Sequence, residues 1–234
     1  MAASFGCDHY GFVVTPNVDH LIRYHDDPVF RRHYQAAAYV LMDSRFASRL
    51  LRLTKGIKLP VCTGSDLTTT LFADIIGPAD RIVLIGGSNE QAQAIVCRYS
   101  LRDVAHHNPP MGFIRDPRAT AECLDFIEAH SPFRFCFLAL GAPQQEAVAY
   151  ALKQRGKARG LALCIGASLN FITGAERRAP VWMQQAGLEW LYRLLQNPRR
   201  LARRYLVRGP RFLLLLRCSK FVLRPRGLRA QPAR

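Results

Sequence analysis

The feature that most constrains the fold is a series of short apolar runs, each closed by a turn-forming or polar residue. Helical stretches separate these runs, such as Glu90–Tyr99, Ala119–Ala129 and Gln144–Gln154. Short, continuously apolar strands that alternate with helices are typical of a parallel sheet covered on both faces. The sequence therefore predicts an α/β fold with a Rossmann-like, mostly parallel sheet and helices on both faces. The predicted strands are Gly11–Thr15, Tyr39–Met42, Arg81–Ile85, Phe133–Leu140 and Leu161–Ile165.

The ends of these strands are the first places to look for a ligand site, because open α/β sheets bind ligands beyond the carboxyl ends of their strands. One end, Gly86-Gly87-Ser88, leads directly into a helix, which is a geometry that suits a phosphate group. The same residues would equally form a tight turn without a ligand. Neither GxGxxG nor the P-loop pattern GxxxxGKS occurs in the chain, which speaks against an NAD-dependent enzyme.

Polar residues follow two other predicted strands. Asp43 comes directly after the second strand, where a carboxylate can act as a general base or hold a hydroxyl group. The alternative is that Asp43 or Ser44 caps the following helix. Asn17, which follows Thr15 at the end of the first strand, could likewise cap a helix or hydrogen-bond a ligand. The local pattern leaves both interpretations open.

The fourth predicted strand ends in an unusually polar segment, Gly141-Ala142-Pro143-Gln144-Gln145-Glu146. Pro143 suits the first position of a helix. The amide and carboxylate groups that follow it exceed what capping requires, so we expect them to border a ligand site.

The positive charge of the chain is concentrated at its C-terminal end. The net charge is +16, and residues 199–234 contain twelve Arg or Lys and no Asp or Glu. This imbalance predicts an anionic partner, which could be membrane lipid, nucleic acid or a phosphorylated substrate. Apolar and basic residues interleave in this segment, as in helices that lie on a membrane surface. We therefore expect a domain over residues 1–190 and a basic, amphipathic, helical appendage over residues 191–234.

A nucleic-acid-binding or nucleotide-binding protein is the competing interpretation of the high charge. Such a protein would place basic residues among exposed aromatic residues across a folded face. Here the charge is confined to one segment, which favours an anionic membrane surface over nucleic acid.

The cysteines and histidines indicate neither disulfides nor a metal site. Seven cysteines are widely spread and form no CxxC pair, which predicts reduced thiols in a cytosolic protein. The N-terminus has no basic stretch followed by an apolar run, so we expect no signal peptide. Near the tail, the longest apolar stretch is residues 212–216, far below the about 20 residues that span a bilayer. No DxD pattern occurs, and we expect no metal cofactor.

Taken together, several motifs resemble the signature of the WecG/TagA/CpsF glycosyltransferase family. The resemblance covers about residues 10–210. The motifs are Thr15-Pro16-Asn17, Asp43, Gly64-Ser65-Asp66, Gly86-Gly87-Ser88, Pro109-Pro110-Met111-Gly112, Gly141 to Glu146, Gly166-Ala167-Ser168, Gly174, Arg178 to Trp182, Gly187 to Arg193 and Asn197 to Arg200.

The resemblance implies a bacterial enzyme that transfers a hexose-type sugar from a UDP-sugar to a saccharide on a polyprenyl diphosphate carrier. It implies inversion at the anomeric carbon without a metal ion, on the inner face of the cytoplasmic membrane. The donor sugar would be N-acetylmannosamine, its uronic acid, or a glucose-type hexose or uronic acid. The sequence is also compatible with a homo-oligomer. Many relatives have Gly after the aspartate where this chain has Ser44, so we expect the acceptor side of the pocket to differ.

The resemblance also assigns roles to residues. The base would be Asp43, with Thr15 and Asn17 lining the same pocket. The nucleotide would be held by Gly64, Ser65, Gly86, Gly87, Ser88, Gly141, Pro143, Gln144, Gln145 and Glu146. Without a metal, the charge of the leaving diphosphate must be met by protein groups. Arginine offers a planar fork of donors to phosphate, and the candidates are Arg193, Arg200, Arg203 and Arg204.

Overall fold

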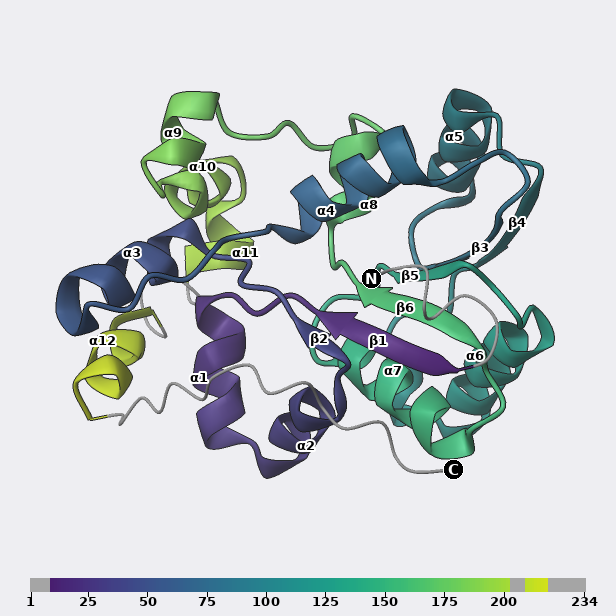
Figure 1. The fold of residues 1–234 in the computed structure, drawn as a ribbon, viewed down its shortest axis with the longest axis horizontal. Coiled ribbons are helices and arrows are strands. Elements are labelled where there is room, and N and C mark those ends of the chain that lie inside the picture. The colour runs from purple at the N-terminus through teal and green to yellow at the C-terminus, as the bar shows by residue number, and fades with distance from the viewer. Residues whose placement is uncertain (1–8, 203–208, 219–234) are drawn as a thin grey trace.

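A central parallel sheet organises the molecule (Figure 1). The computed structural model describes residues 9–202 and 209–218 of the 234-residue chain. Within these ranges six strands, all parallel, lie in the order β2-β1-β6-β5-β3-β4. The predicted α/β fold with a parallel sheet is confirmed. The strands are β1 (Tyr10–Val14), β2 (Tyr39–Val40), β3 (Arg81–Ile85), β4 (Asp103–His107), β5 (Phe135–Leu138) and β6 (Gly160–Cys164).

Helices cover both faces of the sheet, as predicted (Figure 1). Strand residues alternate between the faces, so that Val83 and Ile85 belong to one core and Ile82 and Leu84 to the other. The first core is completed by α2 (Pro28–Ala36), α6 (Pro117–Ala129) and α7 (Gln144–Arg155). The second is completed by α4 (Gly64–Thr70), the π-helical turn Leu71–Ile75, α5 (Asn89–Tyr99) and α8 (Ser168–Ile172).

The remaining helices build one end of the molecule, beyond the carboxyl ends of β1 and β2 (Figure 1). They are α1 (Val18–Asp26), α3 (Arg45–Lys55), α9 (Val181–Gln185), α10 (Glu189–Gln196), α11 (Pro198–Ala202) and α12 (Gly209–Cys218). A 3-10 turn at Phe113–Arg115 precedes α6.

The described part of the basic C-terminal segment is helical and docks on the folded domain. α12 packs against α1, and its Phe212 and Leu216 are buried in a small core with Ile22 and Leu51. On the other side of the helix, Leu213 and its neighbour at position 214 are exposed. The apolar residues of α12 are therefore divided between the protein interior and the surface.

The predicted helix start at Gln144 is confirmed, since α7 begins there. Pro143 lies in the cap position before the helix and not at its first helical position, as its residue type had suggested. The edge strand β4 has no counterpart in the sequence-based prediction, and β2 is shorter than the predicted strand.

A glycine permits the closest backbone approach in the sheet. Gly160 opens β6 with φ of +124°, and a Cβ atom there would lie 2.0 Å from the carbonyl oxygen of Phe133. Only glycine fits this position without moving the loop that leads into β5.

Candidate functional site

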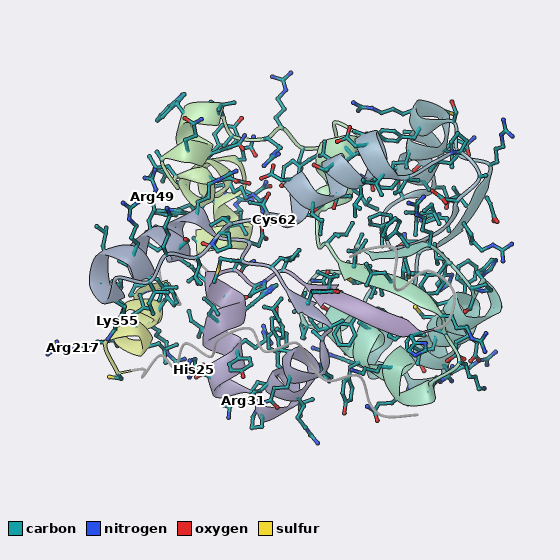
Figure 2. All side chains as sticks on the ribbon, in the orientation of Figure 1. His25, Arg31, Arg49, Lys55, Cys62 and Arg217 are labelled. Atoms are coloured by element: carbon teal, nitrogen blue, oxygen red, sulfur yellow. The ribbon has the colours of Figure 1, made fainter. Side chains whose placement is uncertain are left out.

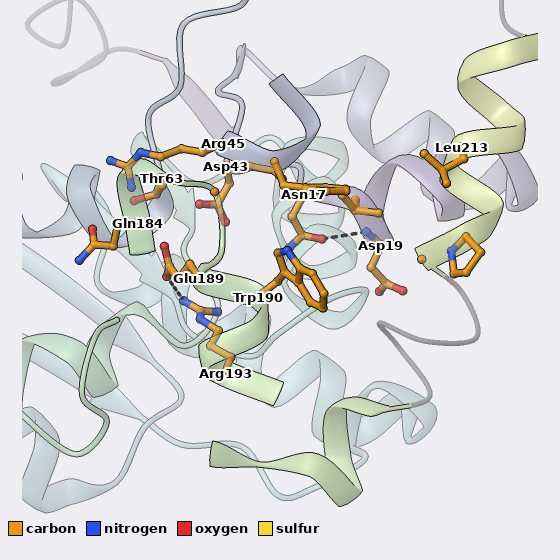
Figure 3. A pocket seen from close by; sticks show the side chains of 16 residues that line it. Asn17, Asp19, Asp43, Arg45, Thr63, Gln184, Glu189, Trp190, Arg193 and Leu213 are labelled. Atoms are coloured by element: carbon orange, nitrogen blue, oxygen red, sulfur yellow. Dashed lines mark hydrogen bonds and ion pairs between the residues drawn. The ribbon is translucent and has the colours of Figure 1, made fainter. Parts of the chain in front are cut away.

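Two cavities meet beyond the carboxyl ends of the strands, and three of the described residues line both of them: Asn17, Asp43 and Arg193. The first cavity, about 250 Å³ in volume, is bordered by residues that follow β1, β2, β5 and β6. We call it the strand-end cavity. The second, about 270 Å³, is bordered by α3, α10 and α12 and contains Phe46 and Trp190. We call it the aromatic cavity, which Figure 3 shows from close by.

The local structure after β2 turns Asp43 toward the site. Ser44 caps α3, because its Oγ accepts a hydrogen bond of 3.1 Å from the backbone N–H of Ala47. The Asp43 carboxylate is therefore not needed as a cap. Its Oδ1 accepts a hydrogen bond of 3.0 Å from the backbone N–H of Gly64, which fixes the carboxylate at the junction of the two cavities.

The surroundings of Asp43 favour its neutral form. Burial raises the pKa of this carboxyl from 3.8 to about 7, although the Gly64 hydrogen bond and the positive charge of Arg193 lower it. The negative charges of Glu189 and Asp66 raise it further. A carboxylate with a pKa near neutrality is well matched to accept a proton at physiological pH.

Asn17 and Thr15 both border the strand-end cavity. The Oδ1 of Asn17 accepts hydrogen bonds from the backbone N–H groups of Asp19 at 3.1 Å and His20 at 3.3 Å, so the capping interpretation is confirmed. The Thr15 hydroxyl donates to the carbonyl oxygen of Cys164 at 2.9 Å. Thr15 thereby joins the ends of β1 and β6 beside the cavity.

The start of α4 also belongs to this region. Ser65 lines the strand-end cavity. At Gly64, a Cβ atom would lie 3.3 Å from Oγ of Ser168 and 3.4 Å from Oγ1 of Thr15. The glycine thus lets α4 approach the strand ends closely enough for its N–H group to reach Asp43.

After β5, Gly141 and Gln145 line the strand-end cavity. The Gln145 Oε1 accepts a hydrogen bond of 2.8 Å from the backbone N–H of Gly166, and its Nε2 donates to Oε1 of Glu146 at 2.9 Å. Glu146 is fully buried, and burial raises its pKa to about 7. The pair connects the turns after β5 and β6.

Three residues of that segment lie away from the cavities. Pro143, Gln144 and Glu146 are not among the described residues that border either cavity. Their predicted contact with a nucleotide stays a prediction.

The turn after β3 is explained by backbone geometry. Gly86 and Gly87 have φ values of +88° and +78°, and a Cβ atom on Gly86 would lie 2.8 Å from the carbonyl oxygen of Ala139. Ser88 caps α5 and forms a reciprocal capping box with Gln91. Gly86, Gly87 and Ser88 are not among the described residues that border the two cavities. A nucleotide-binding role for them also remains a prediction.

Arg193 is the predicted cationic residue that the structure brings to the site. Its Nη2 donates to Oε1 of Glu189 at 3.0 Å, and its guanidinium carbon lies 4.9 Å from the centroid of the Phe171 ring. Arg200 lies in α11, and its side chain is outside the part of the chain that the structure describes. Residues 203 and 204, the positions of the other two predicted arginines, lie outside the described residues.

The aromatic cavity is lined by two aromatic rings, by charged side chains on one side and by an aliphatic side chain on the other. Phe46 and Trp190 meet edge to face with ring centroids 6.2 Å apart. Figure 3 shows Asp43, Glu189 and Arg193 on one side of Trp190 and Leu213 on the other. This arrangement can accommodate a ligand with a polar end near Asp43 and an apolar part near α12.

A cluster of charges supports the wall around Arg45. The Asp66 carboxylate pairs with Arg45 at 3.1 Å and with Arg178 at 2.7 Å. These contacts connect α3, α4 and the segment before α9, and they hold Arg45 at the edge of the aromatic cavity.

Sequence reasoning missed several residues that line the cavities. Glu189 and Trp190 lie in the quoted motif Gly187 to Arg193, but no role was inferred for them. His20 and Glu176 line the strand-end cavity. The ring Nδ1 of His20 lies 2.8 Å from the Tyr34 hydroxyl. A lone histidine or glutamate in a helix or loop gives no signal of such a position.

The described residues show neither a cluster of metal ligands nor a membrane-spanning helix. They contain no group of three or more His, Cys, Asp or Glu side chains arranged to hold a metal ion. No helix in the described ranges is long and apolar enough to cross a bilayer. The six described cysteines are free thiols.

A comparison with known families identifies the chain. The sequence model of the "Glycosyl transferase WecG/TagA/CpsF family" matches residues 2–226, which is nearly the whole chain. The protein therefore belongs to this family and is a glycosyltransferase of polysaccharide synthesis.

Proposed function

We propose that this glycosyltransferase moves a hexose-type sugar from UDP to a saccharide carried on polyprenyl diphosphate, with inversion and with Asp43 as the base. The observation that carries the proposal is the position of Asp43, where two cavities of similar size meet. A transferase must bring two substrates together at one proton acceptor, and this geometry provides a separate place for each.

The strand-end cavity suits the nucleotide sugar. It lies beyond the carboxyl ends of parallel strands, where open α/β sheets bind nucleotides. Its border includes the turn at residues 165–168, the Gln145 amide and the Arg193 guanidinium. Arg193 can pair with the diphosphate as negative charge grows on the leaving group. The predicted Arg200 and Arg203 could add to this charge.

The aromatic cavity suits the acceptor. A sugar ring has apolar faces and polar edges, and Trp190 and Phe46 offer flat apolar surfaces with polar groups nearby. Its far end is formed by Leu213 and Pro210 of α12. That end suits the apolar chain of a lipid carrier.

In this proposal the sugar is transferred in a single displacement. The acceptor hydroxyl oxygen forms a bond to the anomeric carbon of the donor, and the bond from that carbon to the diphosphate oxygen breaks. Asp43 takes the hydroxyl proton, and UDP leaves with the bonding electron pair. Proton transfer to a positioned base contributes about 10²–10⁴-fold to the rate.

We also propose that the enzyme works at an anionic membrane, on the cytoplasmic side that the resemblance implies, and the surface around α12 supports the membrane contact. Leu213 is exposed beside the mouth of the aromatic cavity. Figure 2 shows Lys55 and Arg217 at the edge of the molecule formed by α3 and α12. Basic residues at such a surface contribute about 1 kcal/mol each. Flotation with anionic vesicles tests this part, and a Leu213→Glu variant that floats like the wild type would count against it.

A panel of UDP-sugars tests the donor assignment. A ligand that binds the native state raises the melting temperature, so the true donor and UDP should protect the protein from thermal unfolding. Asp43→Asn should retain this protection and lose transfer to a prenyl-diphosphate-linked acceptor. Absence of protection by every nucleotide sugar would contradict the proposal, as would full transfer activity in Asp43→Asn.

A further inference from the structure

Arg193 is held between the two cavities by one contact from each side. Glu189 lines the aromatic cavity and accepts its hydrogen bond, whereas Phe171 lines the strand-end cavity and lies beneath its guanidinium. Glu189 and Arg193 are four residues apart in α10, so their side chains lie on the same face of the helix. Figure 3 shows this ion pair directly below Asp43.

Arg193 can exchange Glu189 for another anionic partner at a small cost in free energy. Its side chains are 36% and 20% exposed, and a partly exposed pair of this kind contributes little to stability. A diphosphate carries more negative charge than one carboxylate and binds arginine through two parallel hydrogen bonds. A diphosphate in the strand-end cavity can therefore take Arg193 from Glu189 at small cost.

The exchange also changes the charges around Asp43. The charged and titratable groups that act on it are Arg193 and Glu189 of α10 and Asp66 of α4. Asp43 in turn acts on the Tyr34 hydroxyl and the Cys62 thiol. Once Arg193 pairs with the diphosphate, the negative charge of Glu189 is no longer neutralised. A like charge nearby makes a carboxylate hold a proton more strongly, so Asp43 becomes a stronger base when the donor is bound.

We propose that Glu189 holds Arg193 in the free enzyme and releases it to the donor's diphosphate, so that donor binding prepares the site for proton transfer. Glu189 is thus a positioning residue that acts through Arg193 and Asp43. The inference rests on the proposed function, because it takes a nucleoside diphosphate as the ligand of the strand-end cavity.

For Glu189→Gln, we expect UDP binding to strengthen while turnover falls. The variant removes the competing charge, so UDP should bind about two- to fivefold more tightly, as expected for loss of a partly exposed ion pair. At a pH high enough to ionise Asp43 in both proteins, kcat should fall, because Asp43 loses the charge that strengthens it as a base. A residue with a merely structural role would weaken both binding and turnover.

Glu189→Asp separates the two effects. The shorter side chain keeps its charge near Asp43 but reaches Arg193 less well. UDP should again bind more tightly than to the wild type, while kcat should stay closer to the wild-type value than in Glu189→Gln. The matched control is Glu122→Gln, which removes the exposed Arg118–Glu122 pair with the same four-residue spacing on α6.

Calorimetric titration with UDP and steady-state kinetics together decide the matter. Tighter UDP binding with lower kcat in Glu189→Gln, and unchanged values in Glu122→Gln, would support the exchange. Unchanged or weaker UDP binding in both Glu189 variants would overturn the exchange alone. If UDP fails to bind the wild-type protein, the proposed function falls and the exchange falls with it.

Discussion

Replacing Asp43 by asparagine should abolish most activity and yet stabilise the fold at alkaline pH. Burial raises the pKa of this carboxyl from 3.8 to about 7, and one pH unit of difference corresponds to about 1.4 kcal/mol. The unfolded chain releases its proton near pH 4, whereas the folded protein keeps it until about pH 7. The contribution of Asp43 to the free energy of unfolding therefore falls as pH rises from about 4 to about 7, and it stays constant above pH 7.

The size of the effect follows from the same values. Above pH 7 the ionised carboxylate costs the folded protein about 4 kcal/mol. Asparagine removes this cost and can still accept the Gly64 hydrogen bond. Its new amide group offsets part of the gain, by about 1–3 kcal/mol if it finds no partner. That offset does not depend on pH, so the informative quantity is the change in the mutational effect between pH 5 and pH 8.5. We expect about 2–3 kcal/mol.

Urea denaturation of both proteins at the two pH values measures this quantity. Asp74→Asn is a suitable control, because Asp74 is exposed and its carboxylate is solvated in the folded and unfolded states. An effect of Asp43→Asn that is equal at pH 5 and pH 8.5 would refute the reasoning about the buried charge. A loss of transfer of about 10²–10⁴-fold should accompany the stabilisation.

Three further predictions concern the site and the fold. The kcat/KM of the wild-type enzyme for the donor should rise with pH through about 7 and then level off, because this ratio reports the free enzyme and only ionised Asp43 accepts a proton; a profile that is flat from pH 5.5 to 8.5 contradicts this role. Gly160→Ala should lower the free energy of unfolding in urea, because its Cβ atom would overlap the Phe133 carbonyl group, whereas Gly209→Ala should have little effect because the space around it is open. Phe212→Ala should release α12 from α1, since truncating a buried phenylalanine costs about 3–5 kcal/mol. Limited proteolysis should then cleave α12 faster while the urea midpoint of the sheet stays the same; a cleavage rate equal to that of the wild type would count against this docking.

The central strands could be predicted because burial on both faces demands continuous apolar residues. β3 has the predicted bounds, and β1 and β6 are each shifted by one residue. The edge strands were harder. β4 reads Asp-Val-Ala-His-His and is only half-buried, so it offers no apolar run. β2 is reduced to Tyr39–Val40, since it pairs with β1 alone.

The strand ends indicated where polar residues would gather, because the carboxyl ends of parallel strands meet at one edge. Thr15, Asn17 and Asp43 border the same cavity there. The residues contributed by helices could not be found in this way. Phe46 and Trp190 meet across 144 positions of the sequence, where α3 contacts the segment at residues 185–187 that leads into α10.

α10 belongs in part to the predicted appendage and also lines both cavities. The predicted boundary between residues 190 and 191 falls inside this helix, which spans Glu189–Gln196. Its first turn supplies Glu189 and Trp190 to the aromatic cavity, and its second supplies Arg193 to both cavities. Any movement of the C-terminal segment that shifts α10 must therefore change the charge beside Asp43 and the wall of the aromatic cavity together. The segment predicted as a separate appendage therefore forms part of both cavities, and removing it would remove Arg193 from the lining that it shares with Asp43.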